Sequence, residues 1–109
     1  MALTYKVLAQ SSPSATTNTD IYTVGAGKQA VISTITVANR SATARTYRIA
    51  VRPAGATLAN QHYIAYDVTL NGNDTTALTL GITLNTTDVV TVYASTTDLS
   101  FGIFGSEIS

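Results

Sequence analysis

The stretch from Lys28 to Pro53, KQAVISTITVANRSATARTYRIAVRP, constrains the fold more than any other part of the chain. In its second half, apolar residues alternate with polar or charged ones, the period of two that a pleated strand imposes. The apolar positions are Tyr47, Ile49 and Val51. We therefore predict a β-strand with one face in a core and the other against water or a partner.

The first half of the stretch has apolar residues at both odd-numbered and even-numbered positions. Val31, Ile35 and Val37 fall on one face of the expected strand, and Ala30 and Ile32 fall on the other. Both faces are therefore expected to be covered at least in part. The polar residues 39–44 lie between the halves, so we predict that the two strands form a long hairpin.

Shorter segments of the same kind follow one another along the rest of the chain, separated by turn residues such as Asn71-Gly72. In the segment 62–70 the alternation places His62, Ile64, Tyr66, Val68 and Leu70 on one face, which we predict to be the core face. Residues 76–82 are expected to form one strand with a bend at Gly81, and the tail 105–109 is expected to fray. No amphipathic helix is predicted. The pattern indicates an all-β chain, an antiparallel β-sandwich that is jelly-roll-like with about eight strands, the alternative being an antiparallel sandwich of another topology.

The predicted domain organisation is simple, because 109 residues suffice for one core only. Residues 1–10 are an N-terminal arm or an edge strand, and residues 11–19, a polar segment with one proline, are a linker. Residues 20–109 form a single β-sandwich domain.

Charge is scarce and unevenly distributed. Only 11% of the residues are charged, against about 25% in a typical soluble domain, and the formal net charge is zero. All six Lys and Arg residues and a single acid, Asp20, lie in residues 1–52, whereas the other five acids lie in residues 53–109. Either the two halves interleave in space and the charges mix, or a basic edge of one subunit meets an acidic edge of its neighbour. No nucleic-acid partner is expected at zero net charge.

No membrane partner is expected either. The apolar runs are shorter than the ~20 residues that a spanning helix needs, and MALTYKVLAQ is not expected to act as a signal peptide, because Lys6 interrupts its apolar residues. The chain is therefore expected to be made in the cytoplasm of its host.

No set of residues predicts catalysis, a metal or a cofactor. The chain has no cysteine and one histidine, His62, with no nucleophile in a recognisable elbow. Asp74, Asp88 and Asp98 lie in polar turns, where we expect them to cap backbone amides, the alternative being a calcium ion held by loops. We predict that the protein is not an enzyme.

The candidate interface residues are basic. Arg40, Arg45, Arg48 and Arg52 form the one cluster that could contact another subunit, since arginine is favoured over lysine for bidentate pairing. An N-terminal arm would add Tyr5 and Lys6 to such an interface. The alternative is that these arginines are the solvated face of one strand and its turn.

Three phrases of the sequence resemble a group of small Ala/Thr-rich virion structural proteins of tailed bacteriophages, including cyanophages. They are IYTVGAGKQAVISTITVANRSATARTYRIAVRPAG, HYIAYDVTLNGNDTTALTLGITLNTTDVVTVYA and the ending FGIFGSEIS. The resemblance covers nearly the whole chain from Tyr5 onward. It implies a small β-sandwich that assembles as a homo-oligomer, commonly a trimer, and is located in the virion.

For so small a protein the resemblance implies a capsid cement or decoration protein, whose partners are itself and the major capsid protein. The alternative within the same group is a tail or baseplate component that connects fibres to the tail. A glycan-binding module is a further alternative; Tyr63 and Tyr93 would be its aromatic platform, because Tyr47 and Tyr66 are expected in the core.

Overall fold

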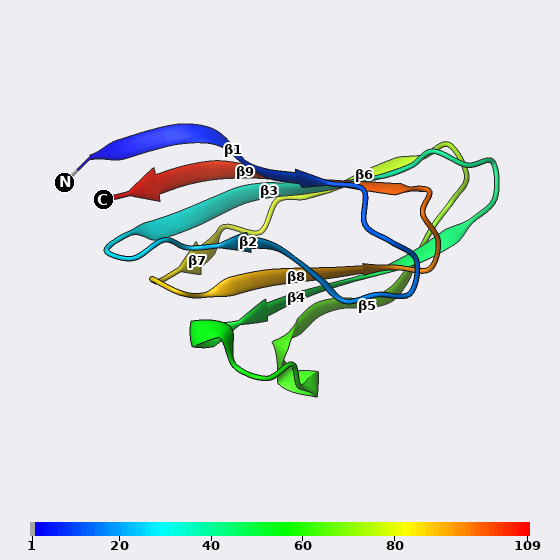
Figure 1. The fold of residues 1–109 in the computed structure, drawn as a ribbon. Helices are drawn as coiled ribbons and strands as arrows, with labels where there is room; N and C mark the ends of the chain where they lie inside the picture. Colours follow the sequence, from blue (N-terminus) through cyan, green and yellow to red (C-terminus); the bar gives the residue numbers. More distant parts are fainter. Residues whose placement is uncertain (1) are drawn as a thin grey trace.

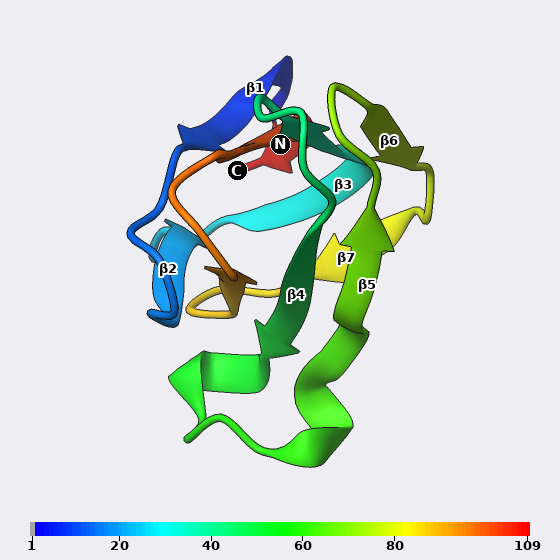
Figure 2. The same ribbon diagram turned by 90° about the vertical axis from the view of Figure 1, so that its right-hand side faces the viewer.

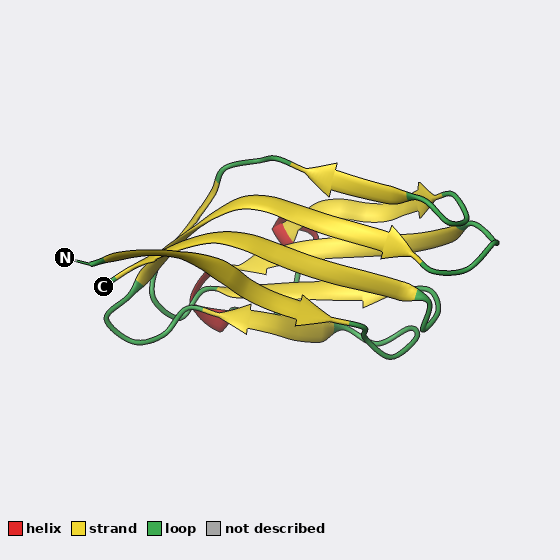
Figure 3. Cartoon of the chain, turned by 90° about the horizontal axis from the view of Figure 1, so that it is seen from above, coloured by secondary structure: helices red, strands yellow, loops and turns green. Residues whose placement is uncertain are grey.

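The computed structural model describes residues 2–109, which fold into two antiparallel sheets packed face to face (Figures 1 and 3). The five-stranded sheet contains β1 (Leu3–Ser11), β9 (Leu99–Ile108), β3 (Gln29–Asn39), β6 (Thr75–Leu78) and β7 (Ile82–Leu84). The four-stranded sheet contains β2 (Thr19–Thr23), β8 (Val89–Ala94), β4 (Arg45–Arg52) and β5 (Tyr63–Leu70). Two short 3₁₀ turns, Pro53–Gly55 and Asn60–His62, connect β4 to β5. The predicted all-β sandwich is confirmed.

The strand pairs are nested, which makes the topology jelly-roll-like. β1 pairs with β9, β2 with β8, β3 with β6 and β7, and β4 with β5, while β3–β9 and β4–β8 pairs complete the sheets. β6 and β7 occupy one place beside β3. We predicted a single strand there, and it is divided in two next to Gly81, whose φ of 64° lies outside strand geometry. The described chain therefore has nine strands where about eight were predicted.

The predicted hairpin between the two halves of 28–53 is wrong. β3 and β4 both exist, but they belong to opposite sheets, and residues 40–44 cross from one sheet to the other. The turn after β5 likewise leads into β6 of the opposite sheet. Alternation tells which face of a strand is apolar, but it does not tell which strand is the hydrogen-bonded neighbour.

The predicted faces of β3 are also wrong, because a bulge interrupts the strand. The register of β3 against β9 shifts between Ile32 and Thr34. The extra residue reverses the alternation, so Ala30 and Ile32 before the bulge and Ile35 and Val37 after it are all buried.

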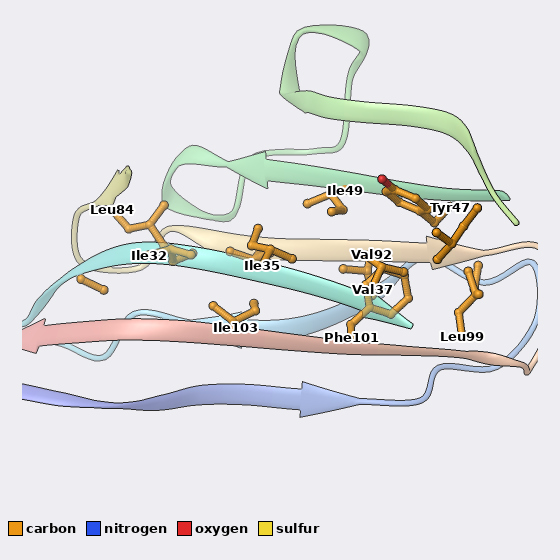
Figure 4. Close-up of a cluster of buried hydrophobic side chains, with 14 of the residues drawn as sticks. Ile32, Ile35, Val37, Tyr47, Ile49, Leu84, Val92, Leu99, Phe101 and Ile103 are labelled. Atoms are coloured by element: carbon orange, nitrogen blue, oxygen red, sulfur yellow. The ribbon is translucent and has the colours of Figure 1, made fainter. Parts of the chain in front are cut away.

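The core lies between the two sheets, and Figure 4 shows ten of its side chains by name. Tyr47 and Ile49 of β4 are buried as predicted, and the Tyr47 ring meets the edge of Phe101 at a centroid distance of 6.3 Å. The other labelled members come from β3, β7, β8 and β9, so both sheets contribute to one core.

The prediction for the apolar face of β5 is wrong. His62 and Leu70, at the two ends of the pattern, are buried, but Ile64, Tyr66 and Val68 are exposed. β5 is an edge strand whose register against β4 shifts in this region, and it is Ala65, not its neighbours, that packs against the core.

Both ends of the chain belong to the sandwich. Of the alternatives for residues 1–10, the structure has the edge strand, with β1 paired along β9; Met1 lies outside the described residues. The predicted linker is partly structured, since Pro13 is buried and Ala15 bridges to Ala94. The tail expected to fray is instead part of β9, which lies between β1 and β3.

Candidate functional site

The arginines of β4 form ion pairs within the chain. Arg45 Nη2 lies 3.2 Å from Asp98 Oδ2, Arg48 Nε lies 2.6 Å from Asp67 Oδ1, and Arg52 Nη2 lies 2.8 Å from Asp20 Oδ1. Two of these acids come from the acidic half of the sequence, so the described structure mixes the charges of the two halves. Arg40 lies apart, beyond the end of β3, and donates to Ser12 Oγ and to the carbonyl of Thr97.

Among these arginines, Arg48 combines its ion pair with contacts to two aromatic rings. Its guanidinium lies between two tyrosine rings, 4.3 Å from the centroid of Tyr66 and 4.2 Å from that of Tyr93. The hydrogen bond to Asp67 raises the already high pKa of Arg48, so the group stays charged. Tyr63 meets Tyr66 edge to face at 4.8 Å, and these two residues line a small hollow together with Asn60. Sequence reasoning missed this group because Tyr66 was expected in the core.

A second polar cluster surrounds Glu107 at the end of β9. Its carboxylate lies 2.6 Å from Lys6 Nζ and 4.0 Å from Lys28 Nζ, and it accepts a hydrogen bond of 2.6 Å from the Tyr22 hydroxyl. The Lys6 and Tyr22 hydrogen bonds hold the pKa of Glu107 below its usual value. Burial, and then the hydrogen bond to Glu107, raise the pKa of Tyr22. Because Glu107 belongs to β9 of one sheet and Tyr22 to β2 of the other, the cluster joins the two sheets.

The outer face of the five-stranded sheet is uncharged in the described residues. Its centre is built from small, hydroxyl and aromatic residues of β3 and β9, namely Thr34, Thr36, Ala38, Ser100, Gly102 and Phe104. Gly102 forms the floor of a shallow hollow, because any Cβ there would come within 2.8 Å of Thr36 Oγ1 and 2.9 Å of the Phe104 ring. Tyr5 of β1 extends this face and is 79% exposed.

The single histidine and the turn aspartates have structural partners. His62 Nδ1 accepts the Ala59 amide, while Asp74 accepts the Thr75 amide and Asp88 accepts the amides of Ala54 and Asn85. Across residues 2–109, no three His, Cys, Asp or Glu side chains are grouped as a metal would require. Within the same range, no helix has the length and apolar character needed to cross a membrane.

Comparison with known proteins identifies no relative: the chain matches no protein-family model, no curated protein and no solved structure. The function must therefore be inferred from the fold and the surfaces described above.

Proposed function

We propose that this chain is a non-enzymatic structural protein of a tailed-phage virion, a decoration protein that cements the capsid. The observation that supports this role best is the uncharged outer face of the five-stranded sheet. A sheet face of small, hydroxyl and aromatic side chains has no charged group to desolvate, so it suits a permanent protein contact. The ionic groups of the described chain, by contrast, are largely engaged with one another.

The expected partner of this face is the major capsid protein. A protein that binds the assembled lattice but not its dispersed subunits stabilises the lattice by mass action, so no chemical step is needed. In this proposal one protruding side chain of the partner binds in the hollow above Gly102.

Location on the particle is the first test. The protein carrying a density tag is located on intact particles by electron microscopy. Density over the head is the expected result, whereas density confined to the tail tip or collar would replace the capsid role with the tail or baseplate alternative. A particle without the protein would overturn both.

The contact face is tested by a matched pair of substitutions. Ala38→Glu places a charge beside the hollow, and Ala56→Glu places the same charge in the exposed connection between β4 and β5. We expect Ala38→Glu to lower binding to particles at least tenfold and Ala56→Glu to leave it unchanged. Equal binding by the two variants would remove this face from the interaction.

A glycan-binding role is the second candidate, and the Tyr63–Tyr66 corner is the observation in its favour. The two rings stand at 85° to each other and line a mainly apolar hollow with Asn60, so a sugar ring could stack on one tyrosine while the amide bonds a hydroxyl. The wild type and Tyr63→Ala are compared on a glycan array. If the wild type binds no glycan more strongly than Tyr63→Ala does, this candidate function is excluded.

A further inference from the structure

A bulge in β5 places two neighbouring side chains on the same face of the sheet. In the register against β4, both Tyr66 and Asp67 fall opposite the single residue Arg48. Asp67 has a φ of 49°, which lies outside strand geometry. In a regular strand these two neighbours would point to opposite faces, whereas the bulge brings both to Arg48 on the outer face of the four-stranded sheet. Non-glycine residues held in such a conformation are concentrated at functional sites, so this bulge leads to a hypothesis of binding.

The bulge fixes the aromatic group beside it. Arg48 donates to both carboxylate oxygens of Asp67, at 2.6 and 3.3 Å, and its guanidinium lies over the Tyr66 ring. Tyr63 meets the fixed Tyr66 ring at an angle of 85°, and Asn60 is exposed beside the two rings. We call Asn60, Tyr63 and Tyr66 the aromatic corner. Because its rings are already positioned, little conformational entropy is lost when a ligand binds there.

The hollow of the aromatic corner has the size and shape for one saturated ring. Its volume is about 260 Å³, below the roughly 300–1,000 Å³ of most small-molecule sites. A flat aromatic ligand fits a slot between parallel rings, whereas two perpendicular rings form a corner. A pyranose sugar has an apolar face of C–H groups that can stack on Tyr63, and a rim of hydroxyls that can bond the amide of Asn60.

The charges beside the hollow distinguish between classes of sugar. The Arg48–Asp67 pair is neutral as a whole, but the side chain of Asp67 is 45% exposed and that of Arg48 only 22%. An approaching ligand therefore meets the carboxylate first, which repels the carboxylate of an acidic sugar. A cationic ligand is disfavoured at the rings, because Arg48 already lies over Tyr66.

We propose that the aromatic corner binds neutral pyranose sugars and rejects acidic ones. The inference rests on the glycan-binding candidate above and names its class of ligand. A ligand of one sugar ring has few atoms, so a dissociation constant on the order of 1 mM is expected for a single site. Many copies on one particle would strengthen the attachment through avidity.

The aromatic corner is separate from the proposed capsid contact. It lies at β5 of the four-stranded sheet, whereas the uncharged outer face belongs to the five-stranded sheet. β5 and β1 lie at opposite corners of the sandwich (Figure 2). A subunit bound to the shell through its uncharged face would therefore leave the aromatic corner open to solvent.

The test is an NMR titration of the full chain with four methyl glycosides as probes. Three are neutral, the glucoside, the galactoside and the mannoside, and the fourth is the glucuronide. We expect at least one neutral sugar to bind, and the glucuronide to bind about threefold more weakly or less. Tyr63→Ala should weaken the binding of that neutral sugar about tenfold. Tyr5→Ala, the matched control at an exposed tyrosine of β1, should leave it unchanged.

Asp67→Asn tests the selectivity for neutral sugars separately. Asparagine tolerates the left-handed backbone at this position but carries no charge. The substitution leaves the charge of Arg48 unbalanced, so the affinity for the glucuronide relative to the neutral sugar should rise about threefold or more. Asp74→Asn, in the turn at the other end of β5, is the control and should not change this ratio.

Other outcomes overturn the inference. If the wild type binds the glucuronide more tightly than the neutral sugars, the ligand class is wrong, but glycan binding survives. If no probe shifts any resonance, the inference and the glycan-binding candidate both fail, whereas the capsid role is measured separately by binding to particles. If circular dichroism shows that Tyr63→Ala is unfolded, the shifted resonances of the wild type locate the site, and shifts confined to residues outside 60–67 remove the aromatic corner.

Discussion

Replacing Asn39 should destabilise the fold more than replacing any other asparagine of its neighbourhood. Asn39 is 3% exposed and links the two connections that cross between the sheets, 40–44 and 71–74. Its amide nitrogen donates to the carbonyls of Thr43, Leu70 and Asn71 at 2.9, 3.1 and 3.2 Å. Its amide oxygen accepts the Ser41 amide at 3.0 Å and the Ser41 hydroxyl at 2.9 Å.

The expected loss follows from the burial of these groups. Asn39→Ala leaves the buried Leu70 carbonyl without its partner, which costs about 1–3 kcal/mol. The other bonds lie nearer to solvent and add roughly 0.5 kcal/mol each, since water can replace part of them. We expect a total loss of about 3–5 kcal/mol, a large part of the 5–15 kcal/mol typical of a domain. For a chain of this length, that loss lowers the melting temperature by about 12–20 °C.

Chemical denaturation and thermal melts followed by circular dichroism measure the effect. Asn71→Ala is the control, because Asn71 lies in the same region with an exposed side chain. Asn39→Asp should be less stable than Asn39→Ala at pH 7, since it removes the donors and places a negative charge beside three carbonyl oxygens. The reasoning is refuted if Asn39→Ala and Asn71→Ala are equally stable, or if the aspartate is better tolerated than the alanine.

Two further predictions concern the polar clusters. Glu107 has a lowered pKa in the folded state, so its contribution to stability is present above the unfolded pKa of about 4.3 and is lost as the pH falls through the folded pKa. Below pH 5, the free energy of unfolding should therefore depend less steeply on pH in Glu107→Gln than in the wild type. An unchanged slope would contradict this prediction. Arg48→Ala should cost about 1–2 kcal/mol, because it removes one partly exposed ion pair and two cation–π contacts. Arg48→Lys should recover only part of that loss in the same denaturation assay, because lysine keeps the charge without the flat stacking surface; full recovery would show that charge alone matters.

Local sequence was sufficient for the kind of secondary structure and for several core residues. The alternation at Tyr47, Ile49 and Val51 depends only on neighbouring residues, and it correctly identified β4 and the burial of Tyr47 and Ile49. The absence of helical periodicity likewise predicted an all-β sandwich. These properties follow from how successive side chains leave an extended backbone.

Which side chains lie on the surface depends on the pairing of strands far apart in sequence, and a period of two in the sequence does not encode that pairing. The bulge in β3 reverses the alternation of its apolar residues, and the edge position of β5 exposes Ile64, Tyr66 and Val68, although their pattern is that of a core strand. The sequence pattern also did not show which acid pairs with each arginine, since Arg48 and Asp67, for example, are 19 residues apart in sequence. Sequence determined which residues can form strands, whereas the tertiary structure decided which strand faces solvent, because a pleated strand has two faces and only its neighbours determine which of them is covered.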